Sequence, residues 1–356
     1  MLKIAHVVNT LSGGGAEKVA VSVYNCLKDK YKNEFIIAKN IVKLNVDFKP
    51  TIIFNKKPLL PSFLYEKLLL YKLKEVLKDF DVAISHLRDM NARLSYLKSK
   101  NLLKPKLIIV EHVTKECYSE KEKRIIKKYY KYADLIVAVS DKVKDDLVEH
   151  FNLEPDKIQV IYNGVDIESV VKLSNAFQTT LNKPCIVSAG RLSIDKDFET
   201  LIKGVCHSNT KPFLYILGEG SKRKDLENLI KSLKLEDKVF LIGFIENPFS
   251  YIKNCDIYIT SSIREAFSMS TLEAMALGKP VISTDVVPFA KDNFNSLVFK
   301  PKDYATLANH IDKLLSNEKL KEFLSKSAHE TAKELSIDSM CREYKNLIER
   351  FKVENV

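Results

Sequence analysis

Two glutamates, Glu265 and Glu273, lie on either side of a short loop and the first turn of an expected helix. The residues that follow Glu265 read Ala-Phe-Ser-Met-Ser, and their backbone N–H groups can face an anion. A phosphate is favoured at the start of a helix, whereas a carboxylate beside a phosphate would repel it. We therefore expect each glutamate to accept hydrogen bonds from neutral sugar hydroxyls, with phosphate between them. The alternative is a pair of solvated glutamates in an exposed loop and helix.

A second pattern with chemical potential is Gly190-Arg191-Leu192, which is followed by Lys196. These residues come directly after the apolar run 185–189, which we expect to be a strand. Arginine offers a planar fork of donors and lysine a compact point charge, so together they can clamp a diphosphate. A merely solvated cationic pair is the alternative.

A glycine-rich turn, LSGGGAEK at residues 11–18, follows the first apolar run and opens a helix expected from Glu17 to about Asp29. Glycines such as Gly14 and Gly15 let the backbone approach a ligand, and the helix N–H groups can point at an anion. The spacing is not GxGxxG, so a dinucleotide site has little support. A plain strand-to-helix turn is the alternative.

Two histidines stand at the ends of expected strands. His112 follows Glu111 at the end of one strand, and His86 ends another. Ligands collect at this position in parallel α/β sheets, so His112 could act on a sugar hydroxyl or a phosphate. Glu111 and His86 are candidates for the acceptor side. A structural role is the alternative for each of them.

Metal binding is not predicted. The pairs Asp79/Asp81 and Asp195/Asp197 have a spacing that could hold Mg²⁺ or Mn²⁺ with a diphosphate. The first pair precedes a strand, and the second encloses Lys196, which would repel a cation. No HExxH, P-loop, GxSxG or zinc pattern is present, and we expect neither a metal nor another cofactor.

Short apolar, β-branched runs alternate with amphipathic stretches along both halves of the chain. Near-continuous apolar strands that alternate with helices are typical of a parallel sheet covered on both faces. We therefore predict an α/β protein with two doubly wound, Rossmann-like domains that face each other across a ligand-binding cleft. The expected strands are 3–10, 34–40, 50–54, 81–86, 106–112, 135–140 and 158–164 in the first half, and 185–191, 213–219, 239–244, 257–262, 280–284 and 296–299 in the second.

The boundary between the domains is expected within 167–184, a polar segment without a clear period. We assign residues 1–168 to the first domain and 169–338 to the second. The remaining residues, 339–356, are expected to contain a final helix. Two local structures can also be placed. Ser270 or Thr271 should cap the helix that Gly278 ends, and Asn163-Gly164, a pair that allows positive φ, should form a turn.

Composition limits the function classes. The chain has 356 residues, 46% of them hydrophobic, so it can bury two cores and is not disordered. No apolar run is long enough to span a bilayer, and MLKIAHVVNTL resembles a first strand more than a signal peptide. Six scattered cysteines without a CxxC pair suggest reduced core thiols in a cytosolic protein, with no disulfide framework.

The net charge of +11 is concentrated in the first half, where residues 1–170 carry 30 Lys and Arg against 22 Asp and Glu. Such an excess favours nucleic acid, anionic lipid or a phosphorylated ligand. No nucleic-acid-binding motif is present, so nucleic acid is not predicted as a partner. Segments 61–81 and 119–132 are basic helices with aliphatic and aromatic residues, which could lie on an anionic membrane surface. Ordinary solvated helices are the alternative.

Taken together, five motifs in chain order resemble glycosyltransferase family 4, the retaining nucleotide-sugar transferases of the GT-B fold. They are Gly14-Gly15-Ala16-Glu17-Lys18, Tyr162-Asn163-Gly164-Val165-Asp166, Gly190-Arg191-Leu192 with Lys196, Glu265 with Glu273, and Gly278-Lys279-Pro280-Val281-Ile282. Their order and spacing match over essentially the whole chain. The segment 217–248 further resembles the members that extend bacterial lipid-linked glycans.

The resemblance implies a role for each motif on the donor side. Arg191 and Lys196 would bind the diphosphate and stabilise the leaving nucleotide without a metal. Glu273 would hold the ribose hydroxyls, and Glu265 the hydroxyls of the donor sugar. The implied donor-binding set is Gly14, Gly15, Gly190, Arg191, Lys196, the amides of Phe267, Ser268 and Met269, and Glu273.

The implied catalytic set is Glu265, His112, Arg191 and Lys196, with His112 near the donor sugar. The resemblance implies transfer of a hexose or N-acetylhexosamine, with a UDP-sugar favoured over a GDP-sugar, to a polyprenyl-linked or polysaccharide acceptor. It also implies a cytoplasmic enzyme, peripheral on the inner face of the membrane, whose final helix crosses back to the first domain.

The chain departs from the family twice. Ala266 follows Glu265 where glycine is usual, and the usual Gly-Gly-x-x-Glu after Thr284-Asp285 is replaced by Val-Val-Pro-Phe-Ala-Lys at 286–291. The alternatives are therefore a GT-B protein that binds nucleotide sugar with little or no catalysis, and a GT-B epimerase or phosphorylase.

Overall fold

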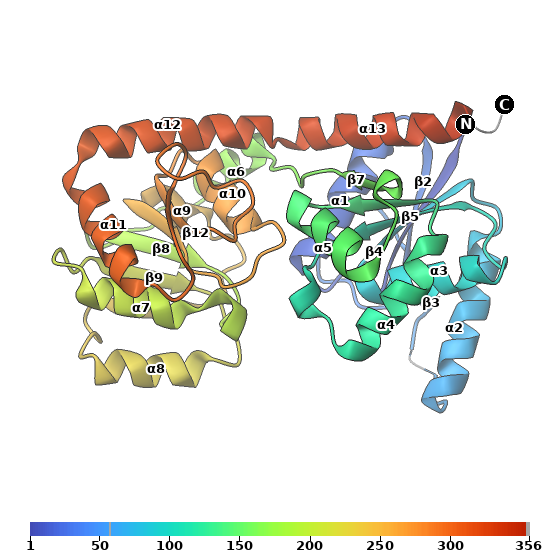
Figure 1. The fold of residues 1–356 in the computed structure, drawn as a ribbon, viewed down its shortest axis with the longest axis horizontal. Helices are drawn as coiled ribbons and strands as arrows, with labels where there is room; N and C mark the ends of the chain where they lie inside the picture. Colours follow the sequence, from blue (N-terminus) through green and yellow to red (C-terminus); the bar gives the residue numbers. More distant parts are fainter. Residues whose placement is uncertain (57, 354–356) are drawn as a thin grey trace. The chain divides into compact units, whose positions relative to one another are not determined.

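The computed structural model describes residues 1–56 and 58–353, and the chain divides into two compact units (Figure 1). Unit 1 comprises residues 1–163 together with the chain from Asp338 onward, and unit 2 comprises Gly164–Ile337. Asn163, the last residue of the first segment, lies five residues before the predicted boundary at residue 168. The C-terminal helix α13 (Ile337–Val353) belongs to unit 1 from Asp338 on.

Unit 1 is built on a parallel sheet in the order β3-β2-β1-β4-β5-β6-β7. The strands are largely hydrophobic where helices cover both faces, although β2 begins with the polar residues Lys32, Asn33 and Glu34. In β1, every residue from Ile4 to Val8 is fully buried. The strand order reverses between β1 and β4, where His6 lies opposite Ile84. The strands are β1 (Lys3–Val8), β2 (Lys32–Lys39), β3 (Thr51–Phe54), β4 (Val82–His86), β5 (Lys106–Glu111), β6 (Leu135–Ala138) and β7 (Ile158–Val160).

Three helices of unit 1 form a connected row in which α2 contacts α3 and α3 contacts α4. Arg93 on α3 binds Glu66 on α2 at 2.7 Å, and Arg88 on α3 binds Glu122 on α4 at 3.1 Å. The helices of this unit besides α13 are α1 (Gly15–Leu27), α2 (Ser62–Leu77), α3 (Arg88–Ser99), α4 (Glu120–Tyr129) and α5 (Asp141–Phe151), with a short 3₁₀ turn η1 (Lys115–Cys117) before α4.

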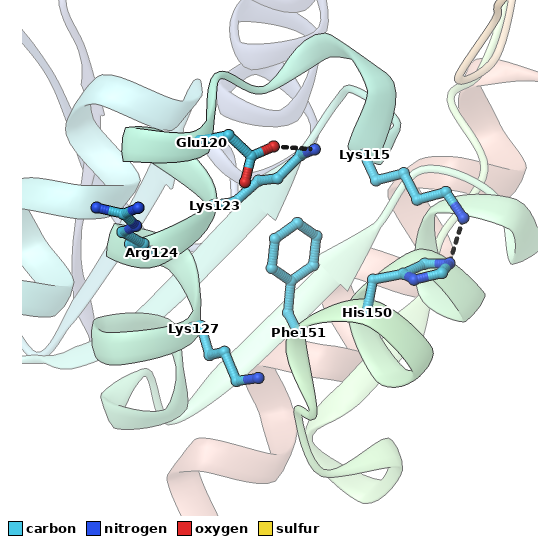
Figure 2. A pocket seen from close by; sticks show the side chains of 7 residues that line it. All are labelled: Lys115, Glu120, Lys123, Arg124, Lys127, His150 and Phe151. Carbon is cyan, nitrogen blue, oxygen red and sulfur yellow. Dashed lines mark hydrogen bonds and ion pairs between the residues drawn. The ribbon is translucent and has the colours of Figure 1, made fainter.

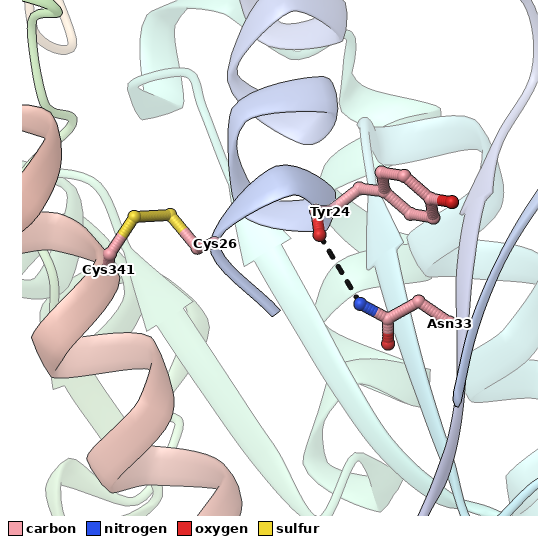
Figure 3. Close-up of a disulfide and its surroundings, with 4 residues drawn as sticks. All are labelled: Tyr24, Cys26, Asn33 and Cys341. Carbon is pink, nitrogen blue, oxygen red and sulfur yellow. Dashed lines mark hydrogen bonds between the residues drawn. A yellow bond between two sulfur atoms is a disulfide. The ribbon is translucent and has the colours of Figure 1, made fainter. Parts of the chain in front are cut away.

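A disulfide joins Cys26 on α1 to Cys341 on α13 (Figure 3). The prediction that all six cysteines are reduced core thiols is therefore wrong for this pair. The two residues are separated by 315 positions, and only the packing of α13 against unit 1 brings them together. Tyr31, at the end of the same turn that follows α1, donates a hydrogen bond to Glu349 of α13 at 2.5 Å.

Unit 2 contains a second parallel sheet, in the order β10-β9-β8-β11-β12-β13, with the reversal between β8 and β11. Its strands are β8 (Cys185–Ala189), β9 (Phe213–Leu217), β10 (Val239–Gly243), β11 (Ile257–Thr260), β12 (Val281–Thr284) and β13 (Leu297–Phe299). Its helices are α6 (Ile167–Ser174), α7 (Phe198–His207), α8 (Arg223–Ser232), α9 (Phe249–Asn254), α10 (Met269–Ala276), α11 (Tyr304–Ser316) and α12 (Glu318–Glu334).

All thirteen predicted strands are present, and the prediction of two doubly wound parallel sheets is confirmed. The segment 167–184 contains a helix that was not predicted, α6, whose N-cap Asp166 accepts a hydrogen bond from the Ser169 N–H at 2.9 Å. Neither Asn163 nor Gly164 adopts the positive φ that this pair allows. Glycine is needed at 164 because a Cβ there would lie 2.5 Å from the carbonyl oxygen of Ser336.

Candidate active site

The carboxyl ends of β8 and β11 carry the charged residues selected in the second half of the sequence. Arg191 and Lys196 follow β8, and Glu265 follows β11, its neighbour in the sheet. The strand order of unit 2 reverses between these two strands, and ligands bind at such a switch point in open α/β sheets. The fold therefore brings the three side chains to one edge of one sheet.

Lys196 and Glu265 form an ion pair through Nζ and Oε1. The Glu265 side chain is only 10% exposed and that of Lys196 25%. The same carboxylate oxygen accepts a hydrogen bond from the Ser262 hydroxyl at 2.9 Å. The Ser261 hydroxyl donates to the carbonyl oxygen of Lys196 at 2.9 Å, which fixes the loop after β8 against the end of β11. Lys196 is thus an oriented cation with one acidic partner.

Arg191 lies on the same loop but differs in its environment. Its side chain is exposed and makes no hydrogen bond or ion pair with the described residues. Its backbone is held on both sides, because the Gly190 N–H donates to Leu217 and the Leu192 N–H donates to Glu219, each at 2.9 Å. The guanidinium is therefore free to bind an anion from a rigid base.

Two glycines of the loop after β9 make this rigidity possible. A Cβ on Gly218 would lie 1.8 Å from the carbonyl oxygen of Gly190, and one on Gly220 would lie 2.2 Å from that of Leu192. Gly218 also has φ of +148°, which L side chains rarely adopt. The loops after β8 and β9 can pack this closely only with glycine at both positions. Neither glycine was predicted from the sequence to contribute to the site.

The loop between the two glutamates leads into α10 through Ser268, the N-cap residue, which has φ of 74°. The predicted caps Ser270 and Thr271 are wrong, since α10 begins at Met269 and its start has no side-chain cap. The Ser268 hydroxyl instead lies 2.8 Å from the Thr271 hydroxyl, which in turn lies 2.7 Å from that of Thr260 on β11. This chain of hydroxyls anchors the start of α10 to the sheet. As predicted, α10 stops before Gly278, which has φ of 64°.

Phe267 is a buried anchor of the same loop, only 3% exposed. Its ring packs against Phe289, with 5.1 Å between ring centroids. Phe289 belongs to the segment that replaces the family's Gly-Gly-x-x-Glu, and Val287 in the same segment is 1% exposed. The shortened segment therefore supplies apolar packing beneath the loop.

Glu273 lies in the second turn of α10 and is partly buried. It is near Tyr258 on β11, whose pKa is raised first by burial and further by the charge of Glu273. The Tyr258 hydroxyl accepts a hydrogen bond from the Ala189 N–H at 3.2 Å, directly before Gly190. Tyr258 thus connects the end of β8 to α10, a positioning role that sequence alone did not indicate.

In unit 1, the glycine-rich turn after β1 is organised by Glu17. Its Oε2 accepts hydrogen bonds from the Gly13 and Gly14 N–H groups at 2.7 and 2.9 Å, and its Oε1 from the Thr10 hydroxyl at 2.6 Å. Burial raises the pKa of Glu17, but these hydrogen bonds outweigh it and lower the pKa below its ordinary value. The Gly14 amide is therefore occupied by a carboxylate of the chain itself, which corrects the expectation of an open anion site there. Gly15 is exposed and has open space where a Cβ would be.

The histidines of unit 1 form a stacked column across the sheet. The rings of His6 and His86 are 6.5 Å apart and those of His86 and His112 5.5 Å. His86 Nδ1 lies 3.3 Å from His112 Nε2. Burial lowers the pKa of His6 to about 3 and that of His112 to about 4, and burial also holds the pKa of His86 well below its ordinary value.

Glu111 and His86 are buried inside unit 1. Glu111 is 1% exposed; its Oε1 accepts a hydrogen bond from the His112 N–H at 2.9 Å and its Oε2 one from the Tyr130 hydroxyl at 3.2 Å. Burial raises the pKa of Glu111 despite these hydrogen bonds. His86 is fully buried. Both side chains can position His112 directly, whereas His112 itself is partly exposed.

Comparison with known proteins adds to this geometry. Residues 6–169 match the family described as Glycosyltransferase Family 4, and residues 172–331 match Glycosyl transferases group 1. An uncharacterised glycosyltransferase of Methanocaldococcus jannaschii is 30% identical over 76% of this chain and 76% of its own length. The chain belongs to the family 4 glycosyltransferases.

Other similarities agree with this assignment. The N-acetylgalactosamine-N,N'-diacetylbacillosaminyl-diphospho-undecaprenol 4-alpha-N-acetylgalactosaminyltransferase of Campylobacter jejuni is 27% identical over 94% of this chain and 95% of its own length. The crystal structure of Anabaena HepE in complex with UDP-glucose superposes with a TM-score of 0.81 at 18% identity, over 98% of this chain and 100% of that one. The fold of this glycosyltransferase is accordingly GT-B.

Two general properties of the enzyme follow from its described parts. In residues 1–56 and 58–353, no group of three or more His, Cys, Asp or Glu side chains is arranged to hold a metal ion. Over the same ranges, every helix is too short or too polar to cross a membrane.

Proposed function

We propose that this glycosyltransferase transfers a hexose or N-acetylhexosamine from a UDP-sugar to a lipid-linked or polysaccharide acceptor, with retention of anomeric configuration and without a metal. The pairing of Lys196 with Glu265, near an Arg191 that has no partner in the part of the chain that the structure describes, carries the proposal. The name of the Campylobacter relative supports a diphosphate-linked polyprenyl acceptor, and the UDP-glucose complex of HepE supports a UDP donor.

The two cations account for the leaving group. Breaking the bond between the anomeric carbon and the diphosphate oxygen leaves positive charge on the sugar and negative charge on that oxygen. Arg191 and Lys196 stabilise this charge more strongly in the transition state than in the ground state, which accelerates the chemical step. They perform the task that a divalent cation performs in metal-dependent enzymes.

Glu265 has two consecutive roles in this scheme. Without donor, its carboxylate neutralises Lys196. When the diphosphate arrives, Lys196 binds phosphate oxygens, and Glu265 becomes an acceptor for sugar hydroxyls. Glu273, in the second turn of α10, then binds the ribose hydroxyls. The site thereby avoids placing an unpaired carboxylate next to phosphate.

The acceptor hydroxyl attacks the anomeric carbon from the face that the diphosphate leaves. Its oxygen forms the new glycosidic bond, and its proton passes to the departing phosphate oxygen, so no nucleophilic carboxylate is needed. We assign acceptor binding to unit 1, and His112 keeps the role implied by the resemblance, a contact with the transferred sugar. Glu111 and His86 act through His112 as positioning residues.

A donor panel tests the proposal. The enzyme is incubated with UDP-, GDP- and ADP-sugars, with and without a polyprenyl diphosphate-linked glycan, in the presence of EDTA. We expect acceptor-dependent release of UDP and an α-linked product from an α-linked donor, read from its anomeric proton coupling. An inverted product, a requirement for Mg²⁺ or Mn²⁺, or release of nucleotide without transfer would each contradict it.

We further propose peripheral contact with an anionic membrane on the cytoplasmic side. The first turn of α2 and the residues before it expose several large apolar side chains, and basic residues follow them along α2. Exposed apolar groups next to cations are typical of helices that lie in a membrane interface. The apolar residues are Leu59, Leu60, Phe63 and Leu64, of which Leu59 and Phe63 are more than half exposed.

A further inference from the structure

A hollow of about 340 Å³ opens on the surface of unit 1 between α4 and α5 (Figure 2). The ring of Phe151, the last residue of α5, lies in the middle of it and is 3% exposed. This volume is at the lower end of the range for small-ligand pockets. The hollow therefore suits a small charged group rather than a whole nucleotide sugar.

One wall of the hollow is a single face of α4. Glu120, Lys123, Arg124 and Lys127 are spaced three and four residues apart, so their side chains emerge on the same side of the helix. Glu120 pairs with Lys123 at 2.8 Å. Arg124 and Lys127 are exposed and make no ion pair or hydrogen bond with the described residues. Lys123 and Lys127 lie four residues apart on this face, and such a pair of like charges destabilises a helix that stands alone.

The opposite wall adds Lys115 from η1 and His150 from α5, whose Nζ and Nε2 atoms are in direct contact. Near this wall the Asp146 carboxylate is engaged by Lys115, whereas the Glu149 carboxylate is largely exposed. Asp146 accepts a hydrogen bond from the Lys115 N–H at 2.9 Å and lies 3.7 Å from its Nζ, and the largely exposed Glu149 lies 3.9 Å from His150. The hollow is thus lined by more positive charge than its carboxylates neutralise.

We propose that this hollow is a binding pocket for a phosphate or diphosphate group. A concave site lined by one sign of charge focuses its field on an oppositely charged ligand. The guanidinium of Arg124 offers a fork of donors, and the lysines around it offer ammonium groups that phosphate oxygens accept. Phe151 supplies an apolar side against which these interactions are less screened.

The pocket is distinct from the proposed donor site, which lies in unit 2. The pocket and the proposed catalytic residue His112 lie on the same connection between β5 and α4, since Lys115 follows His112 by three positions. A ligand held here would therefore order that connection. Its phosphate could come from a lipid-linked diphosphate or from a soluble phosphorylated compound.

The test measures binding of inorganic pyrophosphate by calorimetry to the full chain carrying R191Q/K196Q, so that the proposed donor cations do not contribute. Adding R124Q/K127Q should weaken this binding at least tenfold. The matched control K121Q/K128Q removes the same charge from exposed positions of α4 outside the pocket, and should change it less than twofold. Equal melting temperatures verify that the variants are folded.

A second arm identifies the source of the phosphate. If farnesyl diphosphate binds at least tenfold more tightly than pyrophosphate and loses affinity equally in R124Q/K127Q, the ligand is lipid-linked. Equal affinities of the two compounds indicate a soluble ligand. Both outcomes support the pocket. Absence of pyrophosphate binding, or equal loss in both variant pairs, overturns the proposal. Because the donor cations are already removed, this failure is separate from failure of the proposed transferase mechanism.

Discussion

Lys196 and Glu265, 69 positions apart in the chain, form an ion pair at the switch point of the second sheet, with the Glu265 side chain only 10% exposed. The Ser262 hydroxyl holds the same carboxylate oxygen. The pair keeps a lysine and a glutamate ready near Arg191, which is unpaired within residues 1–56 and 58–353, without leaving a buried charge uncompensated. It makes Lys196 the residue whose removal should most directly affect leaving-group stabilisation.

We expect Lys196→Ala to lower kcat by about 10²–10³. The loss should be larger in kcat/KM than in kcat, because Lys196 also binds the diphosphate of the donor before the reaction. Lys203→Ala is the control: it removes an ion pair with Glu199 at 2.6 Å on the exposed surface of α7 and should leave both constants unchanged. Steady-state kinetics with the donor found in the panel provide the measurement. Less than a tenfold loss of kcat for Lys196→Ala would show that Lys196 does not stabilise the leaving group.

Gly218→Ala should damage the donor loop. The new Cβ would overlap the carbonyl oxygen of Gly190, at 1.8 Å, so the loop that carries Arg191 must move. We expect a loss of about 2 kcal/mol or more in the free energy of unfolding, together with weaker donor binding. Gly15→Ala is the stability control, since its Cβ would meet nothing within 4 Å. Denaturant unfolding and donor-induced thermal shifts measure the two effects; equal stability of the two variants would contradict the packing argument.

The strands could be predicted because their signal is local. Parallel strands buried on both faces are continuous apolar runs, and all thirteen were found from this pattern alone. Charged residues in the loops after such strands, such as Arg191 and Glu265, were correctly predicted to lie at the edge of the sheet where the carboxyl ends of the strands meet. These conclusions need only the order of elements along the chain and the known behaviour of parallel sheets.

What could not be predicted depends on contacts between distant segments. The requirement for glycine at 218 arises from its contact with the loop after β8, and the disulfide of Cys26 arises from the packing of α13. Glu17 was considered only as part of a motif, although its carboxylate occupies the glycine amides. His6 looked like an ordinary strand residue, because its stacking partners come from other elements. Motifs indicate which residues meet a ligand but not which of them are already engaged.

Two histidines, the fully buried His6 and the partly exposed His112, should make stability depend on pH. Their pKa values are lowered by burial, to about 3 for His6 and about 4 for His112, whereas an unfolded histidine titrates near 6.5. Between pH 6.5 and about 4 the unfolded chain therefore binds protons that the folded chain does not. Stability from these groups is complete above pH 6.5 and falls as the pH is lowered, by up to about 1.4 kcal/mol per pH unit for each histidine.

His6→Phe isolates this effect. Neither ring nitrogen of His6 has a hydrogen-bond partner among the described residues, and the ring lies between Tyr24 and Phe35, so phenylalanine fits the same aromatic environment. We expect the variant to be more stable than the wild type, with a difference that grows as the pH falls from 6.5 to 4. Urea unfolding at several pH values measures it. A difference independent of pH would mean that His6 is not held neutral.

The Cys26–Cys341 disulfide should stabilise unit 1. A cross-link between distant positions limits the unfolded chain, and we expect Cys341→Ser to lower the free energy of unfolding by about 2–4 kcal/mol under oxidising conditions. Reductant should lower the melting temperature of the wild type and leave that of Cys341→Ser unchanged. Cys117→Ser, which replaces an exposed free cysteine, should behave as the wild type. Identical melting curves for the wild type with and without reductant would show that the bond does not contribute.

The apolar side chains before and within the start of α2 should control binding to membranes. Leu59 and Phe63 are 103% and 61% exposed, and each would transfer apolar surface from water into the interface. We expect L59S/F63S to reduce co-sedimentation with vesicles that contain phosphatidylglycerol by at least tenfold. Phe244→Ser is the control, because it removes an even more exposed aromatic ring, 76% exposed, from unit 2. Binding to anionic vesicles should also weaken as salt is raised, since the lysines of α2 contribute electrostatic attraction. If the wild type does not bind anionic vesicles, or if both variants bind as the wild type does, α2 is not a membrane contact.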